Sequence, residues 1–124
     1  MTLFEECKEA LSSDFNIVDD EAKKDAVDIL NGYPFLDGNI VWAKLQCSDY
    51  EDINELLKAI YIKNDDVFVF VDDMAIPVFR TKLTLIAENI YDVTALSPKL
   101  FIFNNEIILQ PLFPTEIIRL GTKS

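Results

Sequence analysis

The fold of this chain is decided by the stretch NDDVFVFVDD at residues 64–73. Residues 67–71 are all β-branched or aromatic, and a pair of aspartates stands on either side of them. A short apolar run bounded by turn formers is typical of a strand covered on both faces, whereas a half-exposed strand alternates apolar with polar residues. We therefore predict that residues 67–71 form the central strand of a sheet, with Val69 fully buried and with Phe68 and Phe70 in the core on opposite faces.

The segments around this strand carry the patterns of helices and of further strands. Apolar residues recur at helical spacing, which predicts helices over residues 2–12, from 19 or 20 to 31, over 53–60 and over 83–90. Strands are predicted at 39–46, 76–80, 100–103 and 106–109, with a strand or a helical turn at 117–120. This order predicts an α+β fold, a mostly antiparallel central sheet of about 5–6 strands with helices packed against it.

Local signals mark several boundaries of these elements. The predicted N-caps are Thr2, Asp19 or Asp20, and Ser48 or Asp49. Residues 48–52 are accordingly interpreted as the entry of a helix. Pro77 places its strand at an edge of the sheet because proline cannot donate to a strand ladder. Trp42 is predicted to be a core aromatic, and Asn104-Asn105 to form a hairpin turn.

Length and composition indicate one soluble domain over residues 1–124. Half of the residues are apolar, which is enough for a core without disulfides, and Cys7 and Cys47 are expected to be reduced, buried thiols. Acidic residues follow the initial methionine where a signal peptide needs a basic region, and no apolar run approaches the roughly 20 residues that span a bilayer. We expect a cytoplasmic protein.

The charge of the chain is strongly negative and uneven. The net charge is −11, and residues 1–73 carry 18 acidic and 6 basic residues, whereas residues 74–124 carry 4 and 5. Such a surface repels nucleic acid and anionic membranes and attracts a basic protein. Solubility alone also explains a negative charge, so the charge does not by itself identify a partner.

Catalytic signals are weak. The chain has no histidine, so it lacks the usual general base at neutral pH and the usual zinc ligand. Cys7 lies on the apolar face of a predicted helix, as structural thiols do. Asp72 and Asp73 follow a strand and are able in principle to bind a metal, but a hairpin turn explains the pair more simply. No catalytic residue, metal site or cofactor is predicted.

A series of segments resembles the immunity proteins of bacterial contact-dependent growth inhibition systems. The resemblance is best over residues 67–104, and its most specific part is NIYDVTA at residues 89–95. The segments that carry it are 67–73, 76–83, 88–97 and 100–104. Relatives often end in a strand with acidic and histidine residues, and the corresponding end here, residues 107–113, has no histidine.

The resemblance implies a small cytoplasmic protein that binds one toxin domain, often a nuclease, and blocks its active site or substrate groove. A nuclease presents basic residues to phosphates, so an acidic inhibitor suits the same surface. Two alternatives remain open. One is an adaptor that binds a peptide along the Pro77 edge strand, and the other is a metal-dependent hydrolase built on Asp72 and Asp73.

Acidic groups at the ends of elements are the candidate partner-binding site. We expect them to gather at one edge of the sheet, where Tyr50 adds an aromatic anchor of the kind enriched in binding hot spots. The residues predicted to contact the toxin are Tyr50, Glu51, Asp52, Asp72 and Asp73. The alternative is that these acids are only caps and turns and that contact is made elsewhere, for instance on the carboxy-terminal strands.

Overall fold

The computed structural model describes residues 2–61 and 63–122. Within these ranges the chain forms a seven-stranded sheet in the order β1-β6-β5-β7-β8-β9-β4, and every neighbouring pair is antiparallel. Its strands are β1 Asn16–Ile17, β4 Gln46–Tyr50, β5 Asp66–Val71, β6 Phe79–Lys82, β7 Leu100–Phe103, β8 Ile107–Pro111 and β9 Ile118–Thr122. The α+β prediction is confirmed, and the sheet has one strand more than the expected 5–6 because it includes the two-residue strand β1.

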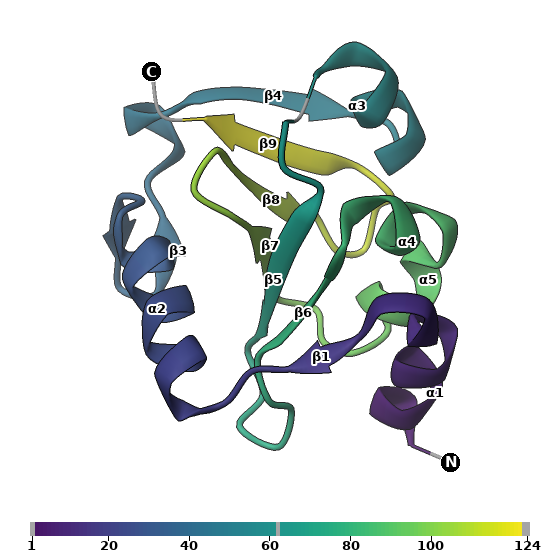
Figure 1. Cartoon of the computed structure of the whole chain (residues 1–124). Coiled ribbons are helices and arrows are strands. Elements are labelled where there is room, and N and C mark those ends of the chain that lie inside the picture. Colours follow the sequence, from purple (N-terminus) through teal and green to yellow (C-terminus); the bar gives the residue numbers. More distant parts are fainter. Residues whose placement is uncertain (1, 62, 123–124) are drawn as a thin grey trace.

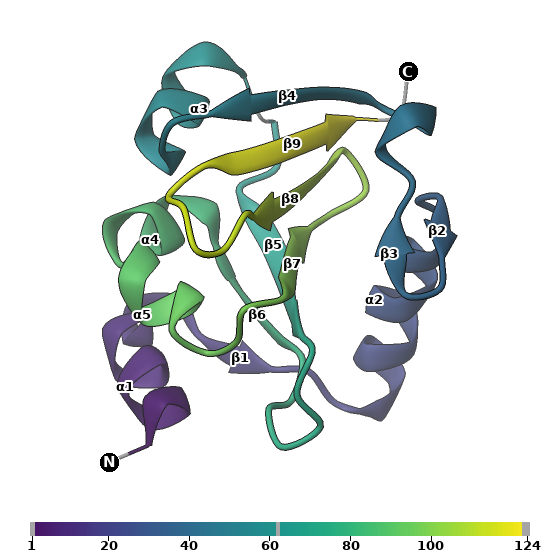
Figure 2. The same ribbon diagram turned by 180° about the vertical axis from the view of Figure 1, so that it is seen from behind.

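Helices cover both faces of the sheet (Figures 1 and 2). The α-helices are α1 Leu3–Ala10, α2 Asp20–Asn31, α3 Ile53–Ala59, α4 Leu83–Glu88 and α5 Ile90–Thr94. Residues from α1, α3, α4 and α5 pack in one apolar cluster, and residues from α2 pack in a second cluster with the small hairpin of β2 Phe35–Leu36 and β3 Asn39–Ile40. The sheet therefore has a core on each side, as the composition of β5 requires.

Strand β5 is central, as the sequence predicts. Val69 pairs with Phe79 of β6 on one side and with Ile102 of β7 on the other, and it is fully buried. The prediction for its neighbours was wrong in one respect. Phe68 and Phe70 lie on the same face, both half-buried against the second cluster, because side chains two residues apart on a strand point the same way.

The segment predicted as one strand over 39–46 is divided. It forms β3, a 3₁₀ turn at Trp42–Lys44 and then β4, so residues 46–50 are strand and not helix entry. Trp42 is half-buried against the second cluster, with the Arg119 guanidinium 5.7 Å from its ring centroid. Gly121 of β9 allows this turn to approach the sheet, since a Cβ there would lie 2.9 Å from the Trp42 ring.

Two further local predictions were wrong. Pro77 lies in the loop before β6, and β6 is an interior strand between β1 and β5, so no edge strand contains Pro77. The helix predicted over 83–90 is divided at Asn89, whose backbone N–H donates to the carbonyls of Leu85 and Ile86. The side chain of Asn89 also donates to the Leu85 carbonyl, which satisfies a terminal acceptor of α4.

The predicted caps of the first two helices are confirmed. The Thr2 hydroxyl accepts from the Glu5 backbone N–H at 3.1 Å, and the Asp19 carboxylate accepts from the Ala22 N–H at 2.8 Å. Helix α3 is capped by Asp52, not by Ser48 or Asp49. Of the two free cysteines, Cys7 is buried and Cys47 is exposed on β4, so the prediction of two buried thiols was wrong for Cys47.

Asn104 joins three parts of the chain at the β7–β8 turn. Its buried side-chain amide donates to the backbone carbonyls of Asn64 and Asp66, and its carbonyl oxygen accepts from the N–H groups of Glu106 and Ile107. A buried amide with all of these partners fixes the turn against the start of β5. The predicted hairpin at Asn104-Asn105 is present, and this network explains why asparagine is suited to it.

Candidate functional site

The structure divides the predicted contact residues into two groups. Tyr50 ends β4, Glu51 follows it and Asp52 begins α3, whereas Asp72 and Asp73 follow β5. Figures 1 and 2 show α3 at one end of the molecule and the loop after β5 at the other. The expected gathering of these acids at one edge of the sheet does not occur. Their contact with a partner remains a prediction for each group separately.

Several of these acids have structural partners. The Asp52 carboxylate accepts from the Glu55 N–H at 2.9 Å, and the Asp73 carboxylate accepts from the Ala75 N–H at 2.9 Å. Both are exposed, so these caps leave carboxylate surface open to solvent. Asp52 and Asp73 are therefore a helix cap and a turn former that also present negative charge.

Two other acidic side chains, Asp49 and Asp66, form ion pairs within the fold. Asp49 on β4 holds Arg119 through two hydrogen bonds of 2.7 and 2.9 Å, and this guanidinium lowers the pKa of the Asp49 carboxyl. Asp66 lies 2.7 Å from both Lys82 and Arg80, and hydrogen bonding to Lys82 is the main reason that its pKa is lowered. These carboxylates belong to ion pairs across the sheet and are less available to a partner.

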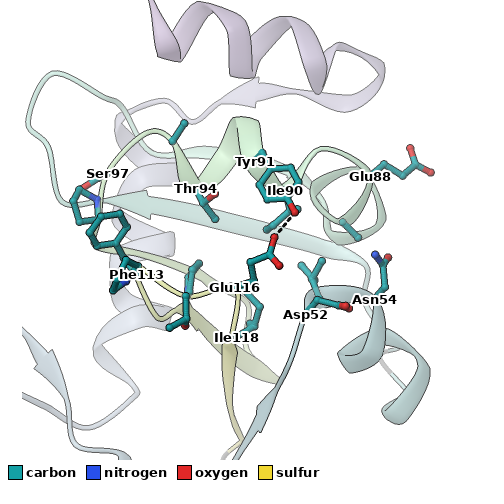
Figure 3. A pocket seen from close by; sticks show the side chains of 17 residues that line it. Asp52, Asn54, Glu88, Ile90, Tyr91, Thr94, Ser97, Phe113, Glu116 and Ile118 are labelled. Carbon is teal, nitrogen blue, oxygen red and sulfur yellow. Dashed lines mark hydrogen bonds between the residues drawn. The ribbon is translucent and has the colours of Figure 1, made fainter.

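Beside Asp52 the surface is hollowed into a groove of about 530 Å³ (Figure 3). One wall comes from the start of α3, another from α4, α5 and the residues that follow them, and a third from the connection between β8 and β9. Its apolar lining residues are Ile53, Ala87, Ile90, Ala95, Pro98, Pro111, Phe113, Pro114 and Ile118. We call this surface the α3–α5 groove.

The α3–α5 groove is acidic as well as apolar. Asp52, Glu88 and Glu116 contribute carboxylates to its lining, and among the residues that the structure describes no lysine or arginine lines it. The Tyr91 hydroxyl donates a hydrogen bond to the Glu116 carboxylate, as Figure 3 shows. This bond, with the charges of Glu116 and Asp52, raises the pKa of Tyr91.

Two aromatic side chains stand exposed at this groove. Tyr91 on α5 is 70% exposed, and Phe113 in the β8–β9 connection is 68% exposed. Large aromatic side chains that remain open beside an apolar hollow are typical of protein contact surfaces. The arrangement can hold an apolar segment of another protein and neutralise positive charge on it.

Sequence reasoning missed most of this site. Of the predicted contact residues only Asp52 lines the groove, and Tyr91, Phe113 and Glu116 were not proposed. One signal was available, because Tyr91 lies within NIYDVTA, the most specific part of the family resemblance. The other walls come from distant segments that only the folded chain brings together.

A second hollow, of about 410 Å³, lies at the loop after β5. Asp72 and Asp73 line it together with Lys23, and Met74 at the tip of the loop is fully exposed. Across residues 2–61 and 63–122 no group of three or more His, Cys, Asp or Glu side chains is arranged to hold a metal ion. In the same part of the chain, none of the helices combines the length and the apolar character needed to cross a membrane.

The fold and the groove define a class of protein: an acidic α+β domain with a groove lined by apolar, aromatic and acidic side chains. A family model described as CdiI immunity protein EcoliA0-like matches residues 1–121, so the chain belongs to this family of bacterial immunity proteins, which inhibit the toxins of contact-dependent growth inhibition. The resemblance stated from residues 67–104 is confirmed and extends over nearly the whole chain. A search among curated proteins gave no match.

Proposed function

We propose that this immunity protein acts in the cytoplasm as a stoichiometric inhibitor with no catalysis of its own. It binds the cognate toxin domain, a nuclease with a basic surface, and covers that toxin's active site or substrate groove. Family membership supports toxin inhibition, and the negative charge of the chain supports a toxin with a basic surface, as a nuclease has.

The observation that carries the proposal is the distribution of unpaired acidic charge. The net charge is −11, and within the described residues the ion pairs join Arg80, Lys82 and Arg119 to Asp14, Asp49 and Asp66. The carboxylates of the α3–α5 groove remain without such partners in that part of the chain. A toxin that binds phosphates presents the complementary charge.

Tyr50, Glu51 and Asp52 contact the toxin in this proposal because they lie beside the groove. Tyr50 packs partly against the first core cluster, while Glu51 is exposed. Asp72 and Asp73 form a separate acidic contact at the other end of the molecule. A toxin contacts both groups only if it spans the molecule from one end to the other. Binding measurements on the two groups separately decide how far the interface extends.

The test is a titration of the purified toxin domain encoded beside this protein. Nuclease activity should fall linearly with added protein and reach zero at one equivalent, because each inhibitor occupies one toxin molecule. The protein alone should neither cleave nor bind the toxin's nucleic acid substrate. Full inhibition by a small fraction of an equivalent would instead reveal a catalytic mechanism, and no inhibition at several equivalents would refute the proposal.

Two sets of charge variants locate the contact. Glu51→Gln with Asp52→Asn changes the group beside the groove, and Asn retains the capping function that Asp52 performs for α3. Asp72→Asn with Asp73→Asn changes the other group by the same charge. Truncating desolvated charges costs about 2–5 kcal/mol of affinity, whereas charges at the periphery mainly change the association rate. Parent-like binding by both double variants would place the interface elsewhere.

A further inference from the structure

We propose that the α3–α5 groove receives an extended segment of the toxin that carries an arginine, with the guanidinium between Asp52 and Glu116 and an apolar neighbour against Phe113. This inference rests on the proposed function and specifies the part of the toxin that is bound. The occupant is a segment with both basic and apolar side chains, because the groove is lined by carboxylates and by apolar residues.

The groove has two chemically different ends. In Figure 3, Asp52 and Asn54 lie at one end and Ser97 and Phe113 at the other, with the Tyr91–Glu116 hydrogen bond between them. The first end offers carboxylate and amide oxygens, and the second offers apolar surface. An occupant that fills both ends has a cationic group a short distance from an apolar side chain.

The acidic end can accept a cation without breaking an ion pair. In the described parts of the chain, every ion pair joins Asp14, Asp49 or Asp66 to a lysine or arginine outside the groove. Glu116 is bonded to the neutral Tyr91 hydroxyl, and Asp52 to a backbone N–H. A guanidinium therefore adds charge pairing that the free protein lacks.

Arginine fits this end better than lysine does. Its planar guanidinium donates to carboxylates in parallel pairs and stacks on aromatic rings, and Tyr91 places such a ring beside Glu116. The volume of about 530 Å³ is in the range of pockets that hold a small ligand or a few side chains. An extended segment presents side chains singly and suits such a groove.

The exposed aromatic side chains provide the apolar half of the site. Phe113 is 68% exposed and lies in the β8–β9 connection, so its ring contributes little to the core of the free protein. Exposed aromatic residues become binding hot spots when a partner removes them from water. We therefore expect Phe113 to matter for binding and little for folding.

The first experiment measures binding of the cognate toxin domain to Glu116→Gln and to Phe113→Ala. Each should weaken affinity by about tenfold or more, mainly through faster dissociation. Asp28→Asn is the charge-matched control on α2, and Leu36→Ala is the control for an apolar residue of similar exposure, 67%. Both controls should bind within about twofold of the parent.

The second experiment identifies the arginine. Each arginine and lysine of the toxin domain is changed to alanine and measured against both the parent and Glu116→Gln, which gives a double-mutant cycle for each pair. One arginine should show strong coupling to Glu116. Coupling to a lysine alone would refute the choice of arginine. The absence of coupling to any basic residue would refute the proposal that a basic segment of the toxin occupies the groove.

The outcomes separate the two proposals. Failure of the parent protein to bind or inhibit the toxin refutes the proposed function. Tight binding by the parent together with parent-like binding by Glu116→Gln and Phe113→Ala leaves inhibition intact and refutes the groove as the contact. Thermal unfolding of each variant establishes that a loss of binding is not a loss of fold.

Discussion

Thr81 carries a polar group that the core does not satisfy. It lies on β6 opposite Val67 and is fully buried, and within the described residues its hydroxyl has no hydrogen-bond partner. Burying an unpaired hydroxyl costs about 1–3 kcal/mol in proteins. A threonine at this position suits a strand through its β-branched shape, and the hydroxyl adds only a penalty.

We expect Thr81→Val to raise the free energy of unfolding by about 1 kcal/mol, because the shape is kept and the unpaired hydroxyl is removed. Chemical denaturation measures the change. Thr84→Val is the matched control, since the Thr84 hydroxyl donates to the Asp65 carboxylate at 2.8 Å. That variant should lose stability, and a loss of similar size in Thr81→Val would show that the Thr81 hydroxyl is satisfied in solution.

The two cysteines differ in environment, since Cys7 is buried and Cys47 is exposed. Burial raises the pKa of the Cys7 thiol to about 12 from an ordinary value of 9.0, with the Asp92 charge adding to the shift. The folded state then keeps a proton that the unfolded state loses, so this contribution to stability is present below about pH 9 and is lost as the pH rises toward 12.

We expect Cys7→Ala to flatten the decline of stability above pH 9 relative to the parent, measured by urea denaturation at a series of pH values. A thiol reagent should modify Cys47 at once in the native protein and Cys7 only after unfolding. Equal labelling of both native thiols would contradict the packing of α1.

Elements defined by nearby residues are the ones that the sequence predicts well. Strand β5 follows from its apolar composition, and α1 and α2 follow from apolar spacing and from the caps Thr2 and Asp19. The hairpin of β7 and β8 follows from its asparagine turn. In each case the residues that carry the sequence signal lie within a few positions of one another along the chain.

Elements defined by distant residues were missed. Among the residues that the structure describes, β4 pairs with β9 alone. Asp49 is therefore part of a strand because it pairs with Arg119, and no local pattern indicates this. Its side chains are mostly exposed, which removes the apolar alternation that reveals a strand. Pro77 was misplaced for a related reason, since β6 begins two residues later and gains β1 as a neighbour.

Aromatic residues on the α2 face of the central strands differ in burial, and this difference sets a prediction for their truncation. Phe103 on β7 is fully buried, whereas Phe70 on β5 is half-buried against the same cluster. Phe103→Ala should cost about 3–5 kcal/mol, as large truncations in cores do. Phe70→Ala should cost about 1–2 kcal/mol because less apolar surface leaves water on folding.

Denaturant midpoints for the two variants test this order. Because both rings lie in one cluster, unequal costs cannot be attributed to different parts of the core. A cost for Phe70→Ala equal to that of Phe103→Ala would mean that Phe70 is fully covered in solution. A small cost for both would contradict the assignment of a core on the α2 face.

At the scale of the molecule, the candidate site is a product of chain topology. The groove joins residues 52–54 and 87–98 with the 111–118 segment, which are separated along the chain by buried strands. No pattern in one segment predicts its neighbours in space, and this is why the sequence predicted Asp52 and not Phe113 as a contact residue. Net charge, in contrast, needs no structure and can be read directly from composition.

Charge far from the groove should act on association and not on the lifetime of the complex. Helix α2 lies on the opposite side of the molecule from α5 (Figure 1), and it exposes Asp20, Glu21, Asp25 and Asp28. A basic toxin is attracted by the summed field of such charges before contact is made. Changing these four residues to Asn or Gln should therefore slow association about tenfold at low salt and leave dissociation unchanged.

Stopped-flow binding of the toxin domain at several salt concentrations measures both rates. At about 1 M salt the Debye length is roughly 3 Å, so the variant and the parent should associate equally fast, which serves as the internal control. A change in dissociation rate would show that α2 itself contacts the toxin. Equal association rates at low salt would show that acidic charge does not steer the encounter, and the basic character assigned to the toxin surface would then be wrong.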